Sequence, residues 1–131
     1  MPLSERLYLI PADFVIETAW EAEPSLFVRS TTGRMLVVTL SADCCSHSYF
    51  PKQSAEAMTS MAGERLLSLT DVEPVEVDSS HEVRYHHLRV VTDKSTTTID
   101  WRNDSNGYYD GTIECVSIDG VSFIESIEVE S

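Results

Sequence analysis

Val-Ser-Ile-Asp-Gly-Val-Ser-Phe, residues 116–123, is the stretch that decides the fold class of this chain. Asp-Gly between two runs of alternating apolar and polar residues is a strong hairpin signal, because a two-residue type I′ loop needs positive φ at both central positions. This hairpin closes a longer run, from Tyr85 to Glu130, that predicts four strands. Further turns are expected at Asp93-Lys94 and at 104–107, Asp-Ser-Asn-Gly. The run therefore predicts an antiparallel meander.

The alternation of residue types within this run predicts which side chains are buried. In segment 96–102, Ile99 and Trp101 alternate with Asp100 and Arg102, as a half-buried strand requires. We therefore expect Ile99 and Trp101 to face the core. The last strand, from Val121 to Glu130, is expected to align three apolar residues on one face: Phe123, Ile127 and Val129.

The first part of the chain predicts three more strands. They are expected at Phe14–Trp20, Leu26–Thr31 and Arg34–Ala42, with a loop around Glu21–Ser25 and a turn at Thr32-Gly33. The near-continuous apolar character of the third segment predicts a strand buried on both faces.

One short segment has helical spacing. Pro51 suits the first helical position, Ala55 and Met58 recur at helical intervals, and Gly63 is a C-terminal stop signal, which together predict a helix over Lys52–Ala62. A further strand, interrupted in the middle, is predicted over 65–70 and 74–77. The predicted fold class is α+β, predominantly antiparallel β, packed as a sandwich or partly open barrel, with one short helix around 52–62. At 131 residues the chain is expected to form a single domain, 1–131.

The two halves of the chain show a weak internal sequence similarity. Shifting Leu26–Ser48 by 62 residues lays it without gaps over Leu88–Asp110, and both pieces predict a strand, a tight turn, a strand and a polar loop. Two hairpins of unrelated origin resemble each other as much. The similarity therefore predicts related geometry but does not establish a duplication.

Composition restricts the possible partners. The formal net charge is −13 with only nine Lys and Arg, which disfavours direct nucleic-acid binding. The acidic residues suit solvated loops and strand faces; the alternative is an acidic surface that binds a basic partner or imitates nucleic acid. Three cysteines favour reduced thiols in a cytoplasm. No secretion signal and no membrane-spanning segment is indicated, so we expect a soluble, cytoplasmic protein without membrane contact.

The most reactive side chains gather at Cys44, Cys45 and His47. Adjacent residues of an extended chain point to opposite sides, which disfavours a shared metal ion, and no cofactor is expected. A cysteine nucleophile needs a histidine base in reach, from His47, His86 or His87. Two packed cysteines explain the same residues, so no catalytic residue is assigned.

A second candidate lies between Trp101 and Tyr109. Trp101, Arg102, Asn106, Tyr108 and Tyr109 bring aromatic, cationic and amide groups into nine residues. Such groups can stack on a planar ligand and bond its edge, although a structural turn anchored by a tyrosine explains them as well.

Two motifs carry a resemblance to a known family. Asp-Cys-Cys-Ser at 43–46 and the segment 101–109, with Thr92-Asp93-Lys94 upstream, resemble short uncharacterised bacterial and phage proteins that share a D-C-C-S loop, a following helix and an S-N-G-Y-Y turn. Ser95 departs from the glycine usual in that family. The resemblance supports the fold, implies no activity, and its phage members suggest a role in host interaction.

We expect a non-enzymatic binding or interaction protein that assembles into a homo-oligomer through strand edges. One alternative is a protein that sequesters a small, nucleotide-like ligand through the loop 102–109. The other is a thiol- or metal-dependent enzyme that uses Cys44 or Cys45 with a histidine.

Overall fold

The computed structural model describes residues 4–10, 13–42, 47–78, 83–104, 111–122 and 126–130. The described elements, in chain order, are β1 (Ser4–Leu9), β2 (Ile16–Ala22), β3 (Ser25–Ser30), β4 (Met35–Ala42), β5 (His47–Tyr49), α1 (Lys52–Thr59), β6 (Leu66–Asp78), β7 (Val83–Thr92), β8 (Thr96–Asp104), β9 (Gly111–Ile118), β10 (Val121–Ser122) and β11 (Ser126–Glu130).

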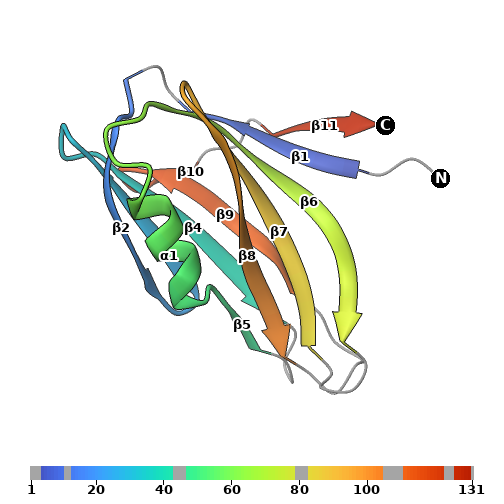
Figure 1. Ribbon diagram of the computed structural model, residues 1–131. Coiled ribbons are helices and arrows are strands. Elements are labelled where there is room, and N and C mark those ends of the chain that lie inside the picture. Colours follow the sequence, from blue (N-terminus) through green and yellow to red (C-terminus); the bar gives the residue numbers. More distant parts are fainter. Residues whose placement is uncertain are drawn as a thin grey trace.

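These strands form two antiparallel sheets. One has six strands in the order β11-β1-β6-β7-β8-β5, and the other has five in the order β10-β9-β4-β3-β2. Figure 1 shows the bent strands β6, β7 and β8 in front of β4 and β9, with α1 at the side. The predicted fold class, mostly antiparallel β with one short helix, is confirmed.

The two sheets share one hydrophobic core. Ile99 and Trp101 of β8 are 2% and 1% exposed, which confirms their predicted burial. The principal partners from both sheets, all buried, are Leu26, Val28, Leu36, Val38, Leu40, Leu69, Leu88, Val90, Ile113 and Val116. Burial of such side chains from water is the main force holding the sheets together.

The hairpin at Asp119-Gly120 has the predicted geometry. Asp119 has φ +54° and Gly120 has φ +80°, and β9 and β10 pair on either side of them. Both central residues are in the left-handed region, as a type I′ loop requires.

The predicted meander is wrong beyond β8. β9 does not continue the sheet of β7 and β8 but pairs with β4 in the other sheet, with Leu36 opposite Ile118 and Val38 opposite Val116. The predicted single last strand is also wrong, because β10 pairs with β9 while β11 pairs with β1 in the six-stranded sheet. Alternation of residue types shows that a strand has a buried face but does not specify its partner.

The prediction that 34–42 is buried on both faces is wrong as well. Leu36, Val38 and Leu40 are at most 2% exposed, whereas the alternating Val37 and Thr39 are only half-buried on the outer face. The apolar run reflects the preference of β-branched residues for strands rather than two covered faces.

Two smaller expectations need correction. The expected loop at 21–25 is a two-residue turn, Glu23-Pro24, between β2 and β3. Segment 66–78, expected as an interrupted strand, is the continuous strand β6, with register shifts between Leu66 and Ser68 and between Val72 and Glu76.

The helix forms where it was predicted but ends earlier. α1 covers Lys52–Thr59, Pro51 is its extended N-cap rather than its first helical residue, and turns carry the chain on to Gly63 at φ +90°. The Ser60 N–H still donates to Glu56 O at 2.9 Å, which closes the helix.

The internal similarity between the halves matches the observed burial only for the first strand of each hairpin. Leu26 and Leu88, 62 residues apart, are both buried, and so are Val28 and Val90. After the turns, the buried residues of β4 are even-numbered and those of β8 are odd-numbered. The even shift therefore places core residues of β4 over outer residues of β8, and the ungapped overlay fails there.

Candidate functional site

The strongest candidate site lies on β2 at Trp20. Its side chain is 39% exposed, although most large apolar residues of the described chain are buried. Trp20 stacks on Phe27 of β3, with ring centroids 5.6 Å apart and ring planes 9° from parallel. This contact fixes the plane of the indole ring before any ligand arrives.

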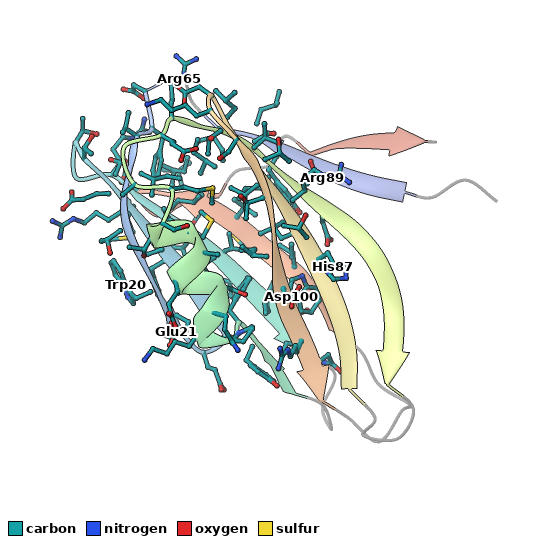
Figure 2. All side chains as sticks on the ribbon, viewed as in Figure 1. Trp20, Glu21, Arg65, His87, Arg89 and Asp100 are labelled. Atoms are coloured by element: carbon teal, nitrogen blue, oxygen red, sulfur yellow. The ribbon has the colours of Figure 1, made fainter. Side chains whose placement is uncertain are left out.

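A depression opens beside Trp20, between β2 and α1. Its volume is about 550 Å³, and we call it the Trp20 slot; it is lined by Ala19, Trp20, Glu21, Lys52, Ala55, Glu56, Thr59 and Ser60. Phe27 lies opposite Trp20 in the β2–β3 pair and stacks on its indole, while Trp20 also lines the slot. Figure 2 shows Trp20 and Glu21 beside α1.

Two carboxylates and one ammonium group border the slot. Glu21 comes from β2 and is half-buried, whereas Glu56 and Lys52 are exposed on α1. None of the three forms an ion pair with another residue of the described chain. The slot therefore combines an aromatic wall with two carboxylates that remain available to a ligand.

Thr59 fixes the distance between α1 and β2. Its hydroxyl accepts a hydrogen bond from Ala19 N–H at 3.1 Å and donates one to Ala19 O at 3.2 Å. Because the same hydroxyl bonds both backbone groups of Ala19 on an edge strand, it links α1 to β2 beside the slot.

A second depression lies on the opposite flank of α1, against β8. Its volume is about 260 Å³, and Asp100, Arg102, Gln53 and Ser54 contribute to its lining. Ser54 Oγ donates to Asp100 O at 2.6 Å, and the Asp100 carboxylate bonds His87 Nδ1 at 3.1 Å. Figure 2 shows His87 and Asp100 next to each other on β7 and β8.

The site residues predicted from the sequence divide into three groups. Trp101 is buried in the core, and Arg102 lines the depression between α1 and β8. His47 begins β5, where its backbone pairs with Asp104. The others lie outside the described residues: Cys44, Cys45, Asn106, Tyr108 and Tyr109.

The described strand ends show how the strands that flank the two predicted loops are paired. Ala42 pairs with Gly111, and His47 pairs with Asp104, so the strands that flank segment 43–46 are paired with those that flank 105–110. Nearby, the buried Asn103 donates from Nδ2 to Ser48 Oγ at 3.0 Å.

In the described ranges, no three His, Cys, Asp or Glu side chains lie close enough to hold a metal ion. Cys115 is a free, half-buried thiol on β9.

The sequence interpretation did not identify Trp20 as a site residue, although one signal was present. Ala-Trp-Glu-Ala-Glu at 19–23 places one large aromatic residue in a short polar segment. Aromatic residues such as tryptophan are enriched in protein interfaces. The stack on Phe27 and the approach of α1, however, depend on tertiary structure.

This geometry defines a class of protein: two antiparallel sheets, with one helix between their edges and a depression on each side of that helix. Within this class, the chain belongs to the family Domain of unknown function (DUF7448), whose model matches residues 14–115. The predicted resemblance to an uncharacterised family is confirmed to that extent. No curated protein and no solved structure matches the chain. In the described part of the chain, no helix is both long and apolar enough to span a bilayer.

Proposed function

We propose that this chain is a non-enzymatic binding protein that recognises another protein through Trp20 and the slot beside α1. The observation that carries the proposal is the exposed indole, 39% accessible and held in plane by Phe27. Tryptophan is strongly enriched among the residues that dominate binding energy in protein interfaces, and a ring fixed beforehand loses little entropy on binding.

The proposal includes a cellular setting. The protein acts in the cytoplasm, where its three cysteines stay reduced. It acts on behalf of a phage or another mobile element, as the motifs at 43–46 and 101–109 suggest by their resemblance to phage proteins.

Comparative capture from a lysate tests the interaction. Trp20→Ser is expected to lose the proteins that the unmodified chain enriches, as measured by quantitative mass spectrometry. The matched control is Val121→Ser, because Val121 is another large apolar residue, 70% exposed, on the β9–β10 hairpin. The proposal fails if Trp20→Ser, folded as judged by circular dichroism, enriches the same proteins to the same extent.

A second candidate function is capture of a small planar ligand at the predicted loops. Its support is the pairing of Ala42 with Gly111 and of His47 with Asp104, which connects the strands around both loops. We propose Arg102, Asn106, Tyr108 and Tyr109 as ligand contacts, with Cys44 and Cys45 on the other predicted loop and His47 at the start of β5. Native mass spectrometry of freshly purified protein is expected to show a bound mass that Tyr108→Ala reduces.

The thiol- or metal-dependent enzyme remains a third prediction. It requires Cys44 or Cys45 within reach of a histidine, and fast and slow alkylating reagents distinguish activated from inert thiols. If all three cysteines react slowly in the folded protein, the enzyme prediction is wrong.

Assembly through strand edges also remains a proposal. Ile16 and Ala19 on the edge of β2 already bond Glu64, Gly63 and Thr59. Among the described edge strands, β11 is longer than β5 and β10, and the longer β2 already has those bonds on its outer side. We propose β11 as the assembly edge.

A further inference from the structure

We infer that the Trp20 slot holds the guanidinium group of an arginine side chain, presented by a basic segment of the partner protein. This inference rests on the proposed function and specifies the chemistry that the partner must present.

The aromatic wall of the slot favours a flat cation. Phe27 stacks on one face of the Trp20 indole, and Trp20 itself lines the slot. A cation placed over an indole face is attracted by the ring quadrupole, and tryptophan gives the strongest such interaction. Guanidinium is planar and weakly hydrated, so it stacks on an aromatic face more readily than an ammonium group does.

The carboxylates of the slot supply the opposite charge. Glu21 and Glu56 lie on different elements and form no ion pair with the described chain, so both can accept hydrogen bonds from one guanidinium group. The net charge of −13 attracts a basic partner over a longer range and speeds its association.

The Lys52 ammonium group repels a cationic ligand. A Lys52 variant should therefore change the affinity in the direction opposite to the glutamate variants. It lies on α1 at the border of the slot, one turn before Glu56. If the ligand is a cation, removing the Lys52 charge must strengthen binding, whereas removing Glu21 or Glu56 must weaken it.

The test uses a peptide with one positive charge. The probe is acetyl-Gly-Ser-Gly-Arg-Gly-Ser-amide, and its control carries citrulline, the neutral isostere of arginine. Nuclear magnetic resonance follows the indole N–H of Trp20, with that of the buried Trp101 as an internal reference. The arginine peptide is expected to shift the Trp20 signal saturably, and the citrulline peptide to bind about tenfold more weakly.

Matched variants separate local from overall charge. Glu56→Gln and Glu114→Gln change the net charge equally, but the exposed Glu114 on β9 does not line the slot. We expect Glu21→Gln and Glu56→Gln each to weaken the arginine peptide about threefold to tenfold and Glu114→Gln to change it less than twofold. Lys52→Gln is expected to strengthen it.

Two results would overturn the inference. Equal affinity for the arginine and citrulline peptides would show that the slot does not select a cation, and the proposed function would stand because a peptide still binds there. Equal weakening by Glu114→Gln and Glu56→Gln would show that affinity follows overall charge rather than this slot. Failure of the proposed function is measured separately, by protein capture with Trp20→Ser.

Discussion

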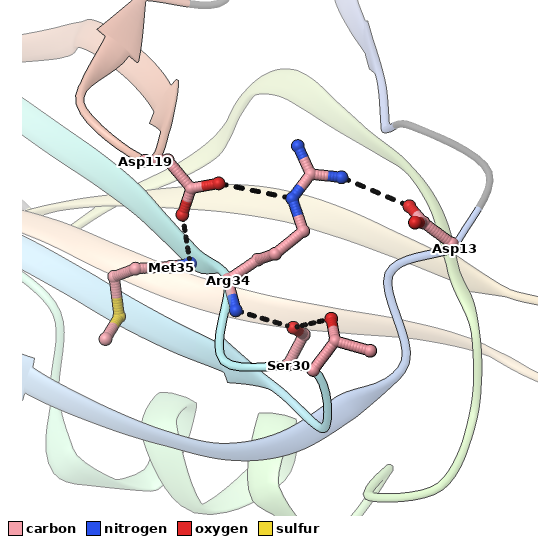
Figure 3. Close-up of polar contacts among 6 residues, drawn as sticks. Asp13, Ser30, Arg34, Met35 and Asp119 are labelled. Atoms are coloured by element: carbon pink, nitrogen blue, oxygen red, sulfur yellow. Dashed lines mark hydrogen bonds and ion pairs between the residues drawn. The ribbon is translucent and has the colours of Figure 1, made fainter.

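Asp119 shows how one residue can serve both a turn and a polar network. Its carboxylate accepts hydrogen bonds from Met35 N–H at 3.0 Å and from Arg34 Nε at 3.2 Å. Arg34 also bonds Asp13 at 3.1 Å, as Figure 3 shows. The bond from the Met35 N–H, and then the Arg34 guanidinium, lower the pKa of Asp119 below its ordinary value. The hairpin β9–β10 is thereby attached to the start of β4.

Asp119→Asn tests the charge while keeping the turn, because asparagine also tolerates positive φ. A carboxyl with a lowered folded-state pKa stabilises the fold above the ordinary aspartate value and loses that contribution as pH falls through the lowered pKa. We expect the variant to have the lower free energy of unfolding at pH 7. The difference should shrink below about pH 4, as measured by urea denaturation at several pH values.

The control for this prediction is Asp13→Asn. Asp13 bonds the same Arg34, but its side chain is 74% exposed, so removing its charge should change stability less. A difference between Asp119→Asn and the unmodified chain that stays constant from pH 7 to pH 3 would contradict the prediction.

At the scale of residues, the sequence predicted what depends on local chemistry. Asp119-Gly120 fixes its own turn, and the alternation around Ile99 and Trp101 fixes their burial. The exposure of Trp20 was not predictable in this way, because it depends on where Phe27 and α1 lie. Residues that define the slot come from elements more than thirty positions apart.

The element with the largest structural role is α1, which connects the edges of the two sheets. Ser54, near its start, donates to Asp100 O on β8, while Thr59, at its end, bonds both backbone groups of Ala19 on β2. Between these hydroxyls, Ala55 and Met58 are buried in the core. The helix therefore satisfies edge-strand backbone with side chains while it closes the side of the core.

Ser54→Ala and Thr59→Val are expected to have different effects. Ser54 is 3% exposed and its bond to Asp100 O is partly buried, so its removal deprives that carbonyl of its donor and should destabilise the fold by about 1–2 kcal/mol. Thr59 is exposed, so water can replace its hydroxyl and the cost should be smaller, but the Ala19 amide should exchange its hydrogen faster. Urea denaturation and hydrogen exchange measure the two effects.

Ser60→Ala is the control for both variants, since the Ser60 hydroxyl bonds Ala57 O within the same turn of chain and touches neither sheet edge. If Ser60→Ala accelerates exchange at Ala19 as much as Thr59→Val does, the proposed connection through Thr59 is wrong.

At the scale of elements, the existence of strands and helix was predictable, but their partners were not. Turn residues and periodicity located α1 and most strands. The pairing of β9 with β4 rather than β8 depends on contacts between segments some 80 residues apart, for which no local pattern provides a signal.

At the scale of the whole molecule, β1 and β11 extend the six-stranded sheet beyond the family match. Both strands lie outside residues 14–115, and they pair with each other over five positions, from Ser4 with Glu130 to Tyr8 with Ser126. β1 also pairs with β6 at Leu9 and Ser68, which attaches the pair to the rest of the sheet. The sequence did not predict this arrangement, because the two strands are the most distant in the chain.

If β11 is the assembly edge, association should depend on salt. β11 carries Glu128 and Glu130, and a second copy brought alongside would place like charges together at neutral pH. We therefore expect sedimentation to show more dimer as salt rises from about 0.02 M to 0.5 M, because the Debye length shortens from roughly 20 Å to a few Å. Glu128→Gln should increase association at low salt.

The control for this edge is Glu114→Gln, which removes the same charge from β9, a strand that pairs on both sides. Association that does not change with salt, or that Glu114→Gln raises as much as Glu128→Gln, would place the contact on another surface.

The hydroxyl bonds of α1 also bear on how the protein avoids polymerising. Bare strand margins are templates on which further chains can add without limit, as in amyloid fibrils. Ser54 and Thr59 occupy such margins on both sheets at once. A mutation that detaches this helix would therefore expose an unpaired strand on each sheet of the same molecule. Such mutants are expected to form fibrils.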